Sequence, residues 1–539
     1  MMKKALFFLM VLSLAWMANA QEDVNNLPYS YTHKDVSYSI DEITMPQVDR
    51  KALLAEDAQN NKNGTPFRIG INHPVGFTFE NCGRTDILSN GAKLWRLGLK
   101  SEGAVSMAVF FSHFNIPEGA TLHIYNGDRT QLTGTYTNAD VQQNGILVSE
   151  DIDDDEIVIE YYEPADALYH GSIYIDRINH HYRDIRKLAA TDDEKAISGG
   201  CHFNAACPEG NGWRDQINSV VRIEIDGAYL CSGALINNAR YDKTLYVLSA
   251  NHCINTANST FKFWFKYETT ACDVDNYGFA NQWVQGGTIV ATDGLNSSDF
   301  LLLRITGDMK RVNMNDLFFA GWDVSGASSV GMAIHHPSGD FKKLSIPKAV
   351  NSGYYANYWN VSWYTYPVKG CTEHGSSGSP LFNAKKLIIG DLSNGRSHCD
   401  TLWGTDNYGK ISNSWTNNNT NNNAKKLKPW LDPDNTGVTW IPGMRYDGTI
   451  VGVNQFDADI RTFNILPNPT SGNVTIQGNF DAEKGVCNVY NMLGARISSY
   501  NVNLDPSFSM NFNDLPNGIY VVEILGGTHS YKSKMVITR

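Results

Sequence analysis

The sequence lacks several features that mark common functional classes. After residue 20 it has no apolar run long enough to span a bilayer. It contains no C-x-x-C pair and no H-E-x-x-H motif, so we expect no metal site, and we expect no cofactor. Charged residues make up only 19%, and the formal net charge is −12. Because nucleic-acid binding needs clustered Lys and Arg, this balance argues against nucleic acid as a partner.

The N-terminus is the one strongly apolar segment. The start Met-Met-Lys-Lys precedes an apolar stretch from Ala5 to Met17, which ends at Ala18-Asn-Ala20. A basic start, a short apolar core and a small-x-small end predict a secretory signal peptide over residues 1–20. The alternative, an uncleaved membrane anchor, is disfavoured because the stretch is short for a bilayer.

Nine cysteines are present, and seven of them lie between residues 201 and 399. In an exported chain such a cluster predicts disulfides, although sequence alone does not determine which cysteines pair. Cys82 and Cys487 lie outside the cluster.

Residues 21–195 form a first, β-rich region. Alternating segments between turn residues predict strands over 105–111, 121–125 and 157–162, which suggest a small β-sandwich. The acidic run Glu150–Glu156 could bind calcium or block a cationic pocket. Such runs are more often solvated loops, and this is the interpretation we prefer.

The second region starts near Ala196 and holds the cysteine cluster. The tract Thr416–Asn423 has the composition of a linker. Because Ala424–Pro433 then supplies helix formers and a tryptophan, we expect the tract to be a surface loop and the domain to run over 196–446. Residues 447–461 are the predicted linker, and short strands over 462–539 predict a small β-sandwich.

Three local sequences together carry the chemistry of an acyl-transfer site. His252 ends an apolar strand, Asp299 begins the apolar segment Ser298–Ile305, and Ser377 lies in a Gly-rich turn. Peptide hydrolysis through a serine needs a base for its proton and a carboxylate to orient that base. Each signal alone is common in structural turns and caps. Their order in an exported, cysteine-rich β domain predicts a His252, Asp299, Ser377 triad.

The turn around the serine also predicts an oxyanion site. The backbone N–H groups of Gly375 and Ser377 can point at one oxygen, which a bulky residue at 375 or 378 would hinder. The order His, Asp, Ser is that of the double-barrel proteases and not of the α/β-hydrolases, whose G-x-S-x-G spacing is absent.

These residues resemble the bacterial lysyl endopeptidases of the trypsin-like superfamily. The resemblance covers about 250 residues, from Ala196 to about Arg445. It rests on these ordered strings: Cys201-x5-Cys207-Pro-Glu-Gly, Ala250-Asn-His-Cys253, Ser298-Asp-Phe300, Ala320-Gly-Trp-Asp323, Ala333-Ile-His-His-Pro337, Thr372-Glu-His-Gly-Ser-Ser-Gly-Ser-Pro380 and Trp430-Leu-Asp-Pro433.

The resemblance implies an all-β, trypsin-like double β-barrel with the same triad in the cleft between the barrels. It also implies three disulfides, namely Cys201–Cys399, Cys207–Cys272 and Cys231–Cys253. Cys371 is not used by the family's bridges, and we expect a buried thiol there. The mature enzyme is expected to be a monomer.

The resemblance further implies a pocket for a substrate lysine. Asp406 matches the position of the carboxylate that receives the lysine, and an ammonium in a narrow pocket needs such a partner. Alternatively, Asp406 is a turn residue. Glu373 and Ser393 match pocket-lining positions, although family members carry a histidine where Ser393 stands.

Two further segments indicate how the protein is processed and exported. Lys195 precedes Ala196, which is five residues before Cys201 as in mature family enzymes, so we expect cleavage between Lys195 and Ala196. Residues 21–195 would then be a propeptide that aids folding and inhibits. Residues 462–539 resemble the type IX secretion sorting domains of Gram-negative bacteria, which implies export through the periplasm to the surface or medium and contact with that machinery. The motifs are Leu466-Pro-Asn-Pro-Thr470, Tyr490-Asn-Met-Leu-Gly494, Leu515-Pro-Asn-Gly-Ile-Tyr520 and Lys534-Met-Val-Ile537.

The leading hypothesis is therefore a secreted serine endopeptidase that cleaves after lysine in protein or peptide substrates. One rival keeps the chemistry with an Arg/Lys pocket or another specificity. The rival from a different class is a non-catalytic adhesin on a protease scaffold, which would be expected to lack a triad member. For the C-terminal region, the alternative is a sandwich that binds carbohydrate or the cell surface.

Overall fold

The computed structural model describes most of residues 27–539. The gaps are 34–35, 37–38, 61–64, 142–144, 185–197, 255, 273–281, 354, 365–369, 400–403, 417–420, 452–462, 479, 481–482, 492–495 and 527–528. The predicted signal peptide and the predicted cleavage site at Lys195–Ala196 lie outside the described residues. The chain divides into two compact units, Met1–Val451 and Gly452–Arg539. Among the described helices, none has the length and apolar character needed to cross a membrane.

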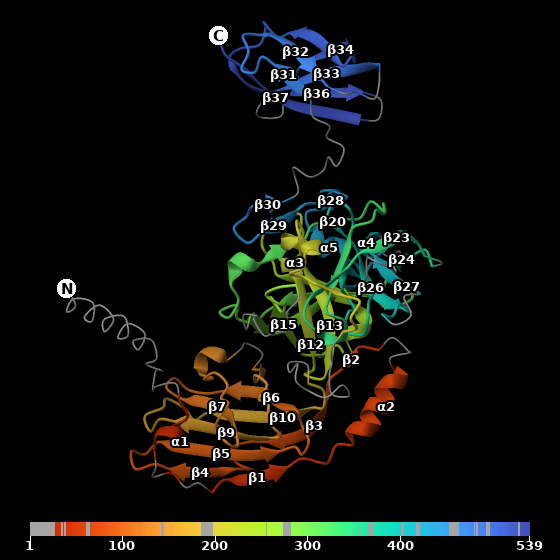
Figure 1. Ribbon diagram of the computed structural model, residues 1–539. Helices are drawn as coiled ribbons and strands as arrows, with labels where there is room; N and C mark the ends of the chain where they lie inside the picture. The colour runs from red at the N-terminus through yellow and green to blue at the C-terminus, as the bar shows by residue number, and fades with distance from the viewer. Residues whose placement is uncertain are drawn as a thin grey trace, which may run out of the picture. The chain divides into compact units, whose positions relative to one another are not determined.

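The first part of unit 1 is a sandwich of two β-sheets (red to orange in Figure 1). One sheet contains β1 (Asp41–Thr44), β4 (Arg84–Ile87), β5 (Lys93–Lys100), β7 (Thr121–Asn126) and β9 (Glu156–Glu163). The other contains β3 (Gly70–Phe77), β6 (Ser106–Asn115), β8 (Leu147–Val148) and β10 (Ser172–His181). Trp95, Phe111 and Ile159 are fully buried in the core that the two sheets share, because alternate residues of each strand face inward. The three strands predicted from sequence correspond to β6, β7 and β9.

Two helices accompany this sandwich, α1 (Tyr29–Thr32) and α2 (Arg50–Asn60). The segment after α2 leaves the sandwich to form β2 (Phe67–Arg68), which pairs with a strand of the next domain. The pattern of apolar residues in the sequence did not predict that β2 pairs with the next domain.

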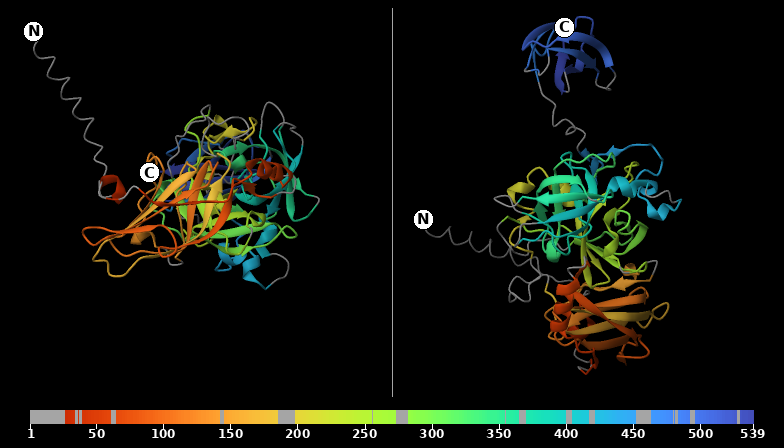
Figure 2. Two further views of the ribbon diagram at one scale, coloured as in Figure 1. Left: turned by 90° about the horizontal axis from the view of Figure 1, so that it is seen from below. Right: turned by 90° about the vertical axis from the view of Figure 1, so that its right-hand side faces the viewer.

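The second part of unit 1 is built on two larger sheets, coloured from yellow through green to blue in Figure 2. The eight-stranded sheet has the order β16-β15-β12-β13-β14-β18-β17, with β2 added at β13. Its own strands are β12 (Val220–Ile225), β13 (Tyr229–Ile236), β14 (Tyr246–Ala250), β15 (Phe261–Phe265), β16 (Gln282–Gln285), β17 (Gly287–Thr292) and β18 (Phe300–Ile305).

The ten-stranded sheet has the order β11-β22-β21-β25-β26-β27-β24-β23, with β20 and β28 at its side. Its strands are β11 (Phe203–Asn204), β20 (Trp322–Asp323), β21 (Met332–His335), β22 (Lys343–Ser345), β23 (Pro347–Ser352), β24 (Tyr358–Trp363), β25 (Pro380–Phe382), β26 (Ile388–Gly395), β27 (Thr405–Lys410) and β28 (Trp440–Ile441). One apolar core, including Leu248, Phe300 and Phe382, joins the two sheets. The result is the predicted all-β, trypsin-like arrangement, built on two mainly antiparallel half-barrel sheets.

The end of this domain packs back onto it. Short helices are α3 (Arg214–Ser219), α4 (Ile411–Thr416) and α5 (Lys428–Leu431). Leu427 and Leu431 are fully buried in the shared core, so the segment after the Asn-rich tract docks on the domain. A small sheet of β19 (Phe318–Phe319), β29 (Gly443–Arg445) and β30 (Ile450–Val451) ends unit 1. Because β30 pairs with β29, the linker predicted over 447–461 was placed too early at its N-terminal end.

Unit 2 is a small β-sandwich (blue in Figure 1). One sheet contains β31 (Asn464–Leu466), β32 (Asn473–Gln477) and β35 (Ser507–Asn511). The other contains β33 (Lys484–Tyr490), β34 (Arg496–Asn503), β36 (Gly518–Gly526) and β37 (His529–Ile537). Ile476, Val489, Val522 and Met535 are fully buried between the sheets, as the sequence pattern predicts.

Candidate active site

His252 and Asp299 lie at the same end of one strand pair. β14 and β18 are antiparallel with Ala250 opposite Phe300. The segment that follows β14, which contains His252, therefore lies beside Asp299, the residue that precedes β18. The imidazole Nδ1 lies 2.7 Å from Asp299 Oδ2. The backbone N–H of His252 donates to Asp299 Oδ1 at 3.1 Å. Both oxygens of the carboxylate therefore hold the histidine in place.

The environment of Asp299 holds its carboxylate in one orientation towards His252. The carboxylate is fully buried, and its backbone adopts φ of 57°, a left-handed conformation that costs free energy for a non-glycine residue. The Ser393 hydroxyl donates to Asp299 Oδ2 at 2.6 Å. In the tautomer whose Nδ1–H donates to the Asp299 carboxylate, Nε2 is the ring nitrogen that can accept a proton. His252 Nε2 is buried and makes no hydrogen bond to any residue that the structure describes.

Ser377 belongs to the other barrel, and its backbone contacts the residue that follows His252. It lies in the turn that leads into β25, and its carbonyl oxygen accepts a hydrogen bond from the backbone N–H of Ser232 at 2.8 Å. Cys253 Sγ lies 3.9 Å from the same carbonyl oxygen. Since Cys253 follows His252 directly and is bonded to Cys231, these contacts tie the serine turn to the histidine turn.

Two glycines are needed in this turn. Gly375 has φ of 86°, and a Cβ there would lie 2.8 Å from the Gly339 nitrogen. Gly378 has φ of 79°, and a Cβ would lie 2.2 Å from Ser249 Oγ. Both the backbone conformation and the lack of space therefore exclude larger residues. Within the described part of the chain, the N–H groups of Gly375 and Ser377 make no hydrogen bond and can serve an incoming oxyanion.

The three predicted substrate-binding residues line one cavity of about 910 Å³ with Ser377. Glu373, Ser393 and Asp406 are part of this lining, whereas His252 and Asp299 are not. The cavity therefore presents the serine and a buried carboxylate to the same space.

Asp406 is a fully buried carboxylate with several hydrogen-bond donors. Trp363 Nε1 and the Thr372 hydroxyl each donate to Oδ2 at 2.7 Å, and the Ser397 hydroxyl donates to the same oxygen. The Ser397 N–H donates to Oδ1 at 3.1 Å. Burial raises the pKa of Asp406 above its usual value, although these donors act in the opposite direction. A Cβ at Gly395 would lie 1.8 Å from Oδ1, so only glycine leaves that oxygen unobstructed.

Glu373 anchors the first described residues of the protease domain. Its Oε1 accepts from the Gly199 N–H at 3.0 Å and lies 3.2 Å from His202 Nε2, while Oε2 accepts from the Ser338 hydroxyl at 3.0 Å. Burial raises the pKa of Glu373, but the hydrogen bonds from His202, Gly199 and Ser338 outweigh it and hold the pKa below its usual value. Glu373 is therefore an ionised wall of the cavity.

Ser393 has a contact that the sequence did not predict. It lines the cavity, as a substrate-binding residue would, but its hydroxyl is used by Asp299. It is therefore a positioning residue for the His252–Asp299 pair. No local signal identifies it, because it lies 94 positions from Asp299.

The cysteine cluster forms three disulfides, Cys201–Cys399, Cys207–Cys272 and Cys231–Cys253. These are the pairs that the resemblance implies. Cys371 is a buried thiol with Sγ 3.4 Å from Cys201 Sγ. The sulfurs of Cys201, Cys371 and Cys399 and the ring of His202 come close enough together to hold a metal ion. Cys201 and Cys399 are joined in a disulfide, however, and so cannot act as thiolate ligands.

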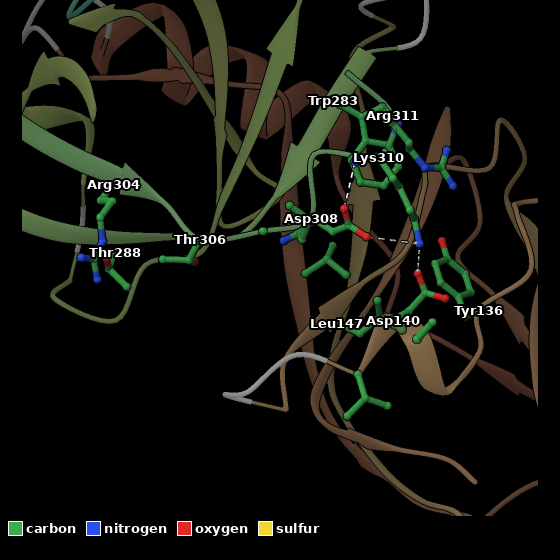
Figure 3. Close-up of a pocket in the computed structure, with 15 residues that line it drawn as sticks. Tyr136, Asp140, Leu147, Trp283, Thr288, Arg304, Thr306, Asp308, Lys310 and Arg311 are labelled. Atoms are coloured by element: carbon green, nitrogen blue, oxygen red, sulfur yellow. Dashed lines mark hydrogen bonds and ion pairs between the residues drawn. The ribbon is translucent and has the colours of Figure 1, made fainter. Parts of the chain in front are cut away.

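A second cavity, of about 550 Å³, lies between the N-terminal sandwich and the eight-stranded sheet (Figure 3). Lys310 Nζ lies 2.6 Å from Asp140 Oδ1, and Arg311 lies 2.6 Å from Glu150 Oε1. Nearby, the buried pair Lys262 and Asp151 is separated by 3.9 Å. The prediction that the run Glu150–Glu156 is merely a solvated loop is therefore wrong, because Glu150 and Asp151 face cations of the second domain.

Comparison with known proteins agrees with the motifs. Residues 196–409 match the family model described as lysyl endopeptidase, C-terminal domain. Residues 464–538 match the secretion system C-terminal sorting domain. A curated lysyl endopeptidase of Pseudomonas aeruginosa is 28% identical over 388 residues, which are 66% of this chain and 79% of that protein. Both resemblances drawn from the sequence motifs are confirmed.

Solved structures similar to this chain include two proteases. A Glu endopeptidase in complex with MPD is 14% identical, covers 40% of this chain and 93% of its own, and gives a TM-score of 0.27. Neuropsin, a serine protease expressed in mouse brain, is 13% identical, covers 43% of this chain and 98% of its own, and gives a TM-score of 0.25.

Proposed function

We propose that this chain, a serine endopeptidase related to lysyl endopeptidases, hydrolyses peptide bonds on the carboxyl side of lysine through an acyl-enzyme. The observation that carries the proposal is the cavity that Ser377 shares with the buried carboxylate Asp406, next to the oriented pair His252–Asp299. The nucleophile and base would supply the chemistry, and the carboxylate would supply the specificity.

Acylation begins at Ser377. Its oxygen attacks the carbonyl carbon of the lysine residue while His252 Nε2 takes the hydroxyl proton. The carbonyl oxygen becomes negative and accepts hydrogen bonds from the N–H groups of Gly375 and Ser377. The C–N bond then breaks, and the imidazolium returns the proton to the leaving amine. Asp299, 2.7 Å from Nδ1, stabilises the imidazolium during this exchange.

Deacylation repeats the same steps with water. His252 Nε2 takes a proton from water, and the resulting hydroxide attacks the ester carbon. The bond between that carbon and the Ser377 oxygen breaks, and the serine regains its proton from His252. The products are a peptide that ends in lysine and the free enzyme.

Lysine specificity would rest on charge pairing in a site shielded from water. The substrate ammonium would approach Asp406 past Gly395, with Glu373 as a second negative wall. A buried ammonium is costly unless it is paired with a negative charge, and these carboxylates would supply that charge. An apolar or acidic side chain has no positive charge to pair and would gain nothing from them.

The experiment that tests this function is a set of fluorogenic peptides that differ only at the residue before the scissile bond. We expect the highest kcat/KM with lysine at that position. Equal rates with arginine would support the Arg/Lys alternative. A preference for an apolar residue would remove Asp406 from the specificity pocket, and turnover of none of the peptides would support the non-catalytic alternative.

We propose that cleavage between Lys195 and Ala196 releases residues 21–195 as a propeptide. N-terminal sequencing of the secreted enzyme should begin at Ala196. Lys195→Gln should leave the chain uncut at this point, because glutamine is a long polar side chain that lacks the charge for Asp406. Lys187→Gln is the control, and it should mature as wild type does. A mature N-terminus far from Ala196 would contradict the proposal.

The sorting domain indicates export to the cell surface or the medium of a Gram-negative bacterium. We propose that it engages the type IX secretion machinery. Deleting residues 462–539 should retain the protein in the periplasm, whereas deleting a stretch of the Asn-rich tract at 417–420 should not. Immunoblots of cell fractions would measure this, and normal secretion of the truncated chain would contradict the sorting role.

A further inference from the structure

The N-terminal region reaches the catalytic cleft through one short strand. β2 pairs antiparallel with the start of β13, with Arg68 opposite Tyr229 and Phe67 opposite Leu230. The next residue, Ile69, donates its N–H to the Ala228 carbonyl at 2.8 Å. Three consecutive residues therefore add an eighth strand to the seven that the second domain itself supplies.

The occupied strand edge lies next to the catalytic base. β13 continues directly from Leu230 into Cys231, whose disulfide leads to Cys253, the neighbour of His252. The following residue, Ser232, donates its N–H to the Ser377 carbonyl oxygen. A chain bound at Tyr229–Leu230 therefore lies beside Cys231 and Ser232, the two residues of β13 that contact the histidine turn and the serine turn.

Phe67 borders the cleft itself. It lines the same cavity of about 910 Å³ as Ser377 and Asp406. Phe67 is 6% exposed and Ile69 is 1% exposed, and both pack with the fully buried Leu230. The guanidinium of Arg183 lies 5.1 Å from the centre of the Phe67 ring. Backbone pairing and apolar packing together hold Phe67 at the edge of this cavity.

A buried network holds the added strand in position. Arg68 Nε donates to Asp57 Oδ1 at 2.8 Å, and the Tyr182 hydroxyl and Arg183 donate to Asp57 Oδ2 at 2.6 and 2.8 Å. His181 Nε2 lies 2.7 Å from the carbonyl oxygen of Gly227, in the turn before β13. The strand is therefore preorganised, which reduces the entropy lost on docking.

We propose that the Tyr229–Leu230 edge and its apolar pocket form a docking surface for an extended polypeptide with a large apolar side chain, and that residues 67–69 occupy it in place of substrate. The inference rests on the proposed function and adds to it. Cleavage after Lys195 alone does not free the cleft. β2 lies far from the cleaved bond in the sequence, and its non-covalent contacts with β13 do not depend on that bond. Activity towards proteins then follows dissociation of the N-terminal region.

The test uses the full-length chain cut after Lys195, with both fragments retained. Phe67→Ala should raise the rate of cleavage of a labelled unfolded protein at least ten-fold over the cut wild type. Tyr174→Ala removes a half-exposed aromatic side chain of the same region and should change nothing. Phe67→Leu keeps an apolar side chain and should restore most of the inhibition. Equal rates for wild type and Phe67→Ala would overturn the proposal.

A second measurement does not depend on the folding of any variant. A synthetic peptide of residues 65–70 should inhibit the mature enzyme competitively, and the same peptide with alanine for Phe67 should bind at least ten-fold more weakly. Equal inhibition by both peptides, or none by either, would overturn the proposal. Labelling of Ser377 by a fluorophosphonate reports the nucleophile separately, so failure of the proposed function is distinguished from failure of this inference.

Discussion

Ser377→Ala is expected to lower kcat on a lysyl peptide by roughly a million-fold, because a catalytic nucleophile acts as a unit with its base. The residual rate would come from the N–H groups of Gly375 and Ser377 and from substrate binding alone. Since Ser377 makes its tertiary contact through its carbonyl oxygen, loss of the hydroxyl should leave the thermal unfolding midpoint nearly unchanged. Stopped-flow kinetics and circular dichroism would measure the two quantities.

Ser328→Ala is the matched control, because Ser328 is exposed and lies outside the cavity. It should retain full activity. If Ser377→Ala also retained activity, the assignment of His252, Asp299 and Ser377 as a triad would be wrong, whatever the specificity of the protein.

Asp406→Asn is expected to lower kcat/KM for lysyl peptides by roughly 10²- to 4 × 10³-fold. Removing one partner of a buried charge pair costs about 3–5 kcal/mol, because the ammonium is left without compensation. The rate on an otherwise identical peptide with an uncharged residue before the scissile bond should change by less than about ten-fold. That comparison separates a specificity defect from a folding defect.

Asp434→Asn is the control for this substitution, since Asp434 is an exposed carboxylate that pairs with Arg240. It should leave the peptide preference unchanged. An Asp406→Asn enzyme that still preferred lysine as strongly as wild type would show that the ammonium binds elsewhere.

The same carboxylate predicts a pH dependence. Burial raises the pKa of Asp406 in the free enzyme, so the group becomes protonated at a higher pH than an exposed aspartate does. Below that pKa the substrate ammonium loses its partner, and KM for lysyl peptides should rise as the pH falls. The dependence should vanish in Asp406→Asn, which profiles of KM against pH would establish.

Local sequence predicted much of the fold and supplied the candidate triad. β6 and β9 follow from short runs of β-branched and aromatic residues between turns, and β36 follows from the alternation of buried and more exposed residues. His252, Asp299 and Ser377 stand at strand ends or in a Gly-rich turn, where their side chains can be presented by backbone that needs few distant contacts. Gly375 and Gly378 follow from the same turn chemistry.

Only the tertiary structure decided the contacts between distant segments. Asp406 takes its donors from Trp363, Thr372 and Ser397, and Asp299 takes one from Ser393, although no local pattern links these residues. The acidic run Glu150–Glu156 was misinterpreted because the cations that face it, Arg311 and Lys262, lie in another domain. Nothing in the local sequence marked Phe67, because its place in the cleft depends on the pairing of β2 with β13. Periodicity reports only which residues a segment buries, whereas the partners of those residues depend on how the sheets close and pack, which is a property of the whole fold.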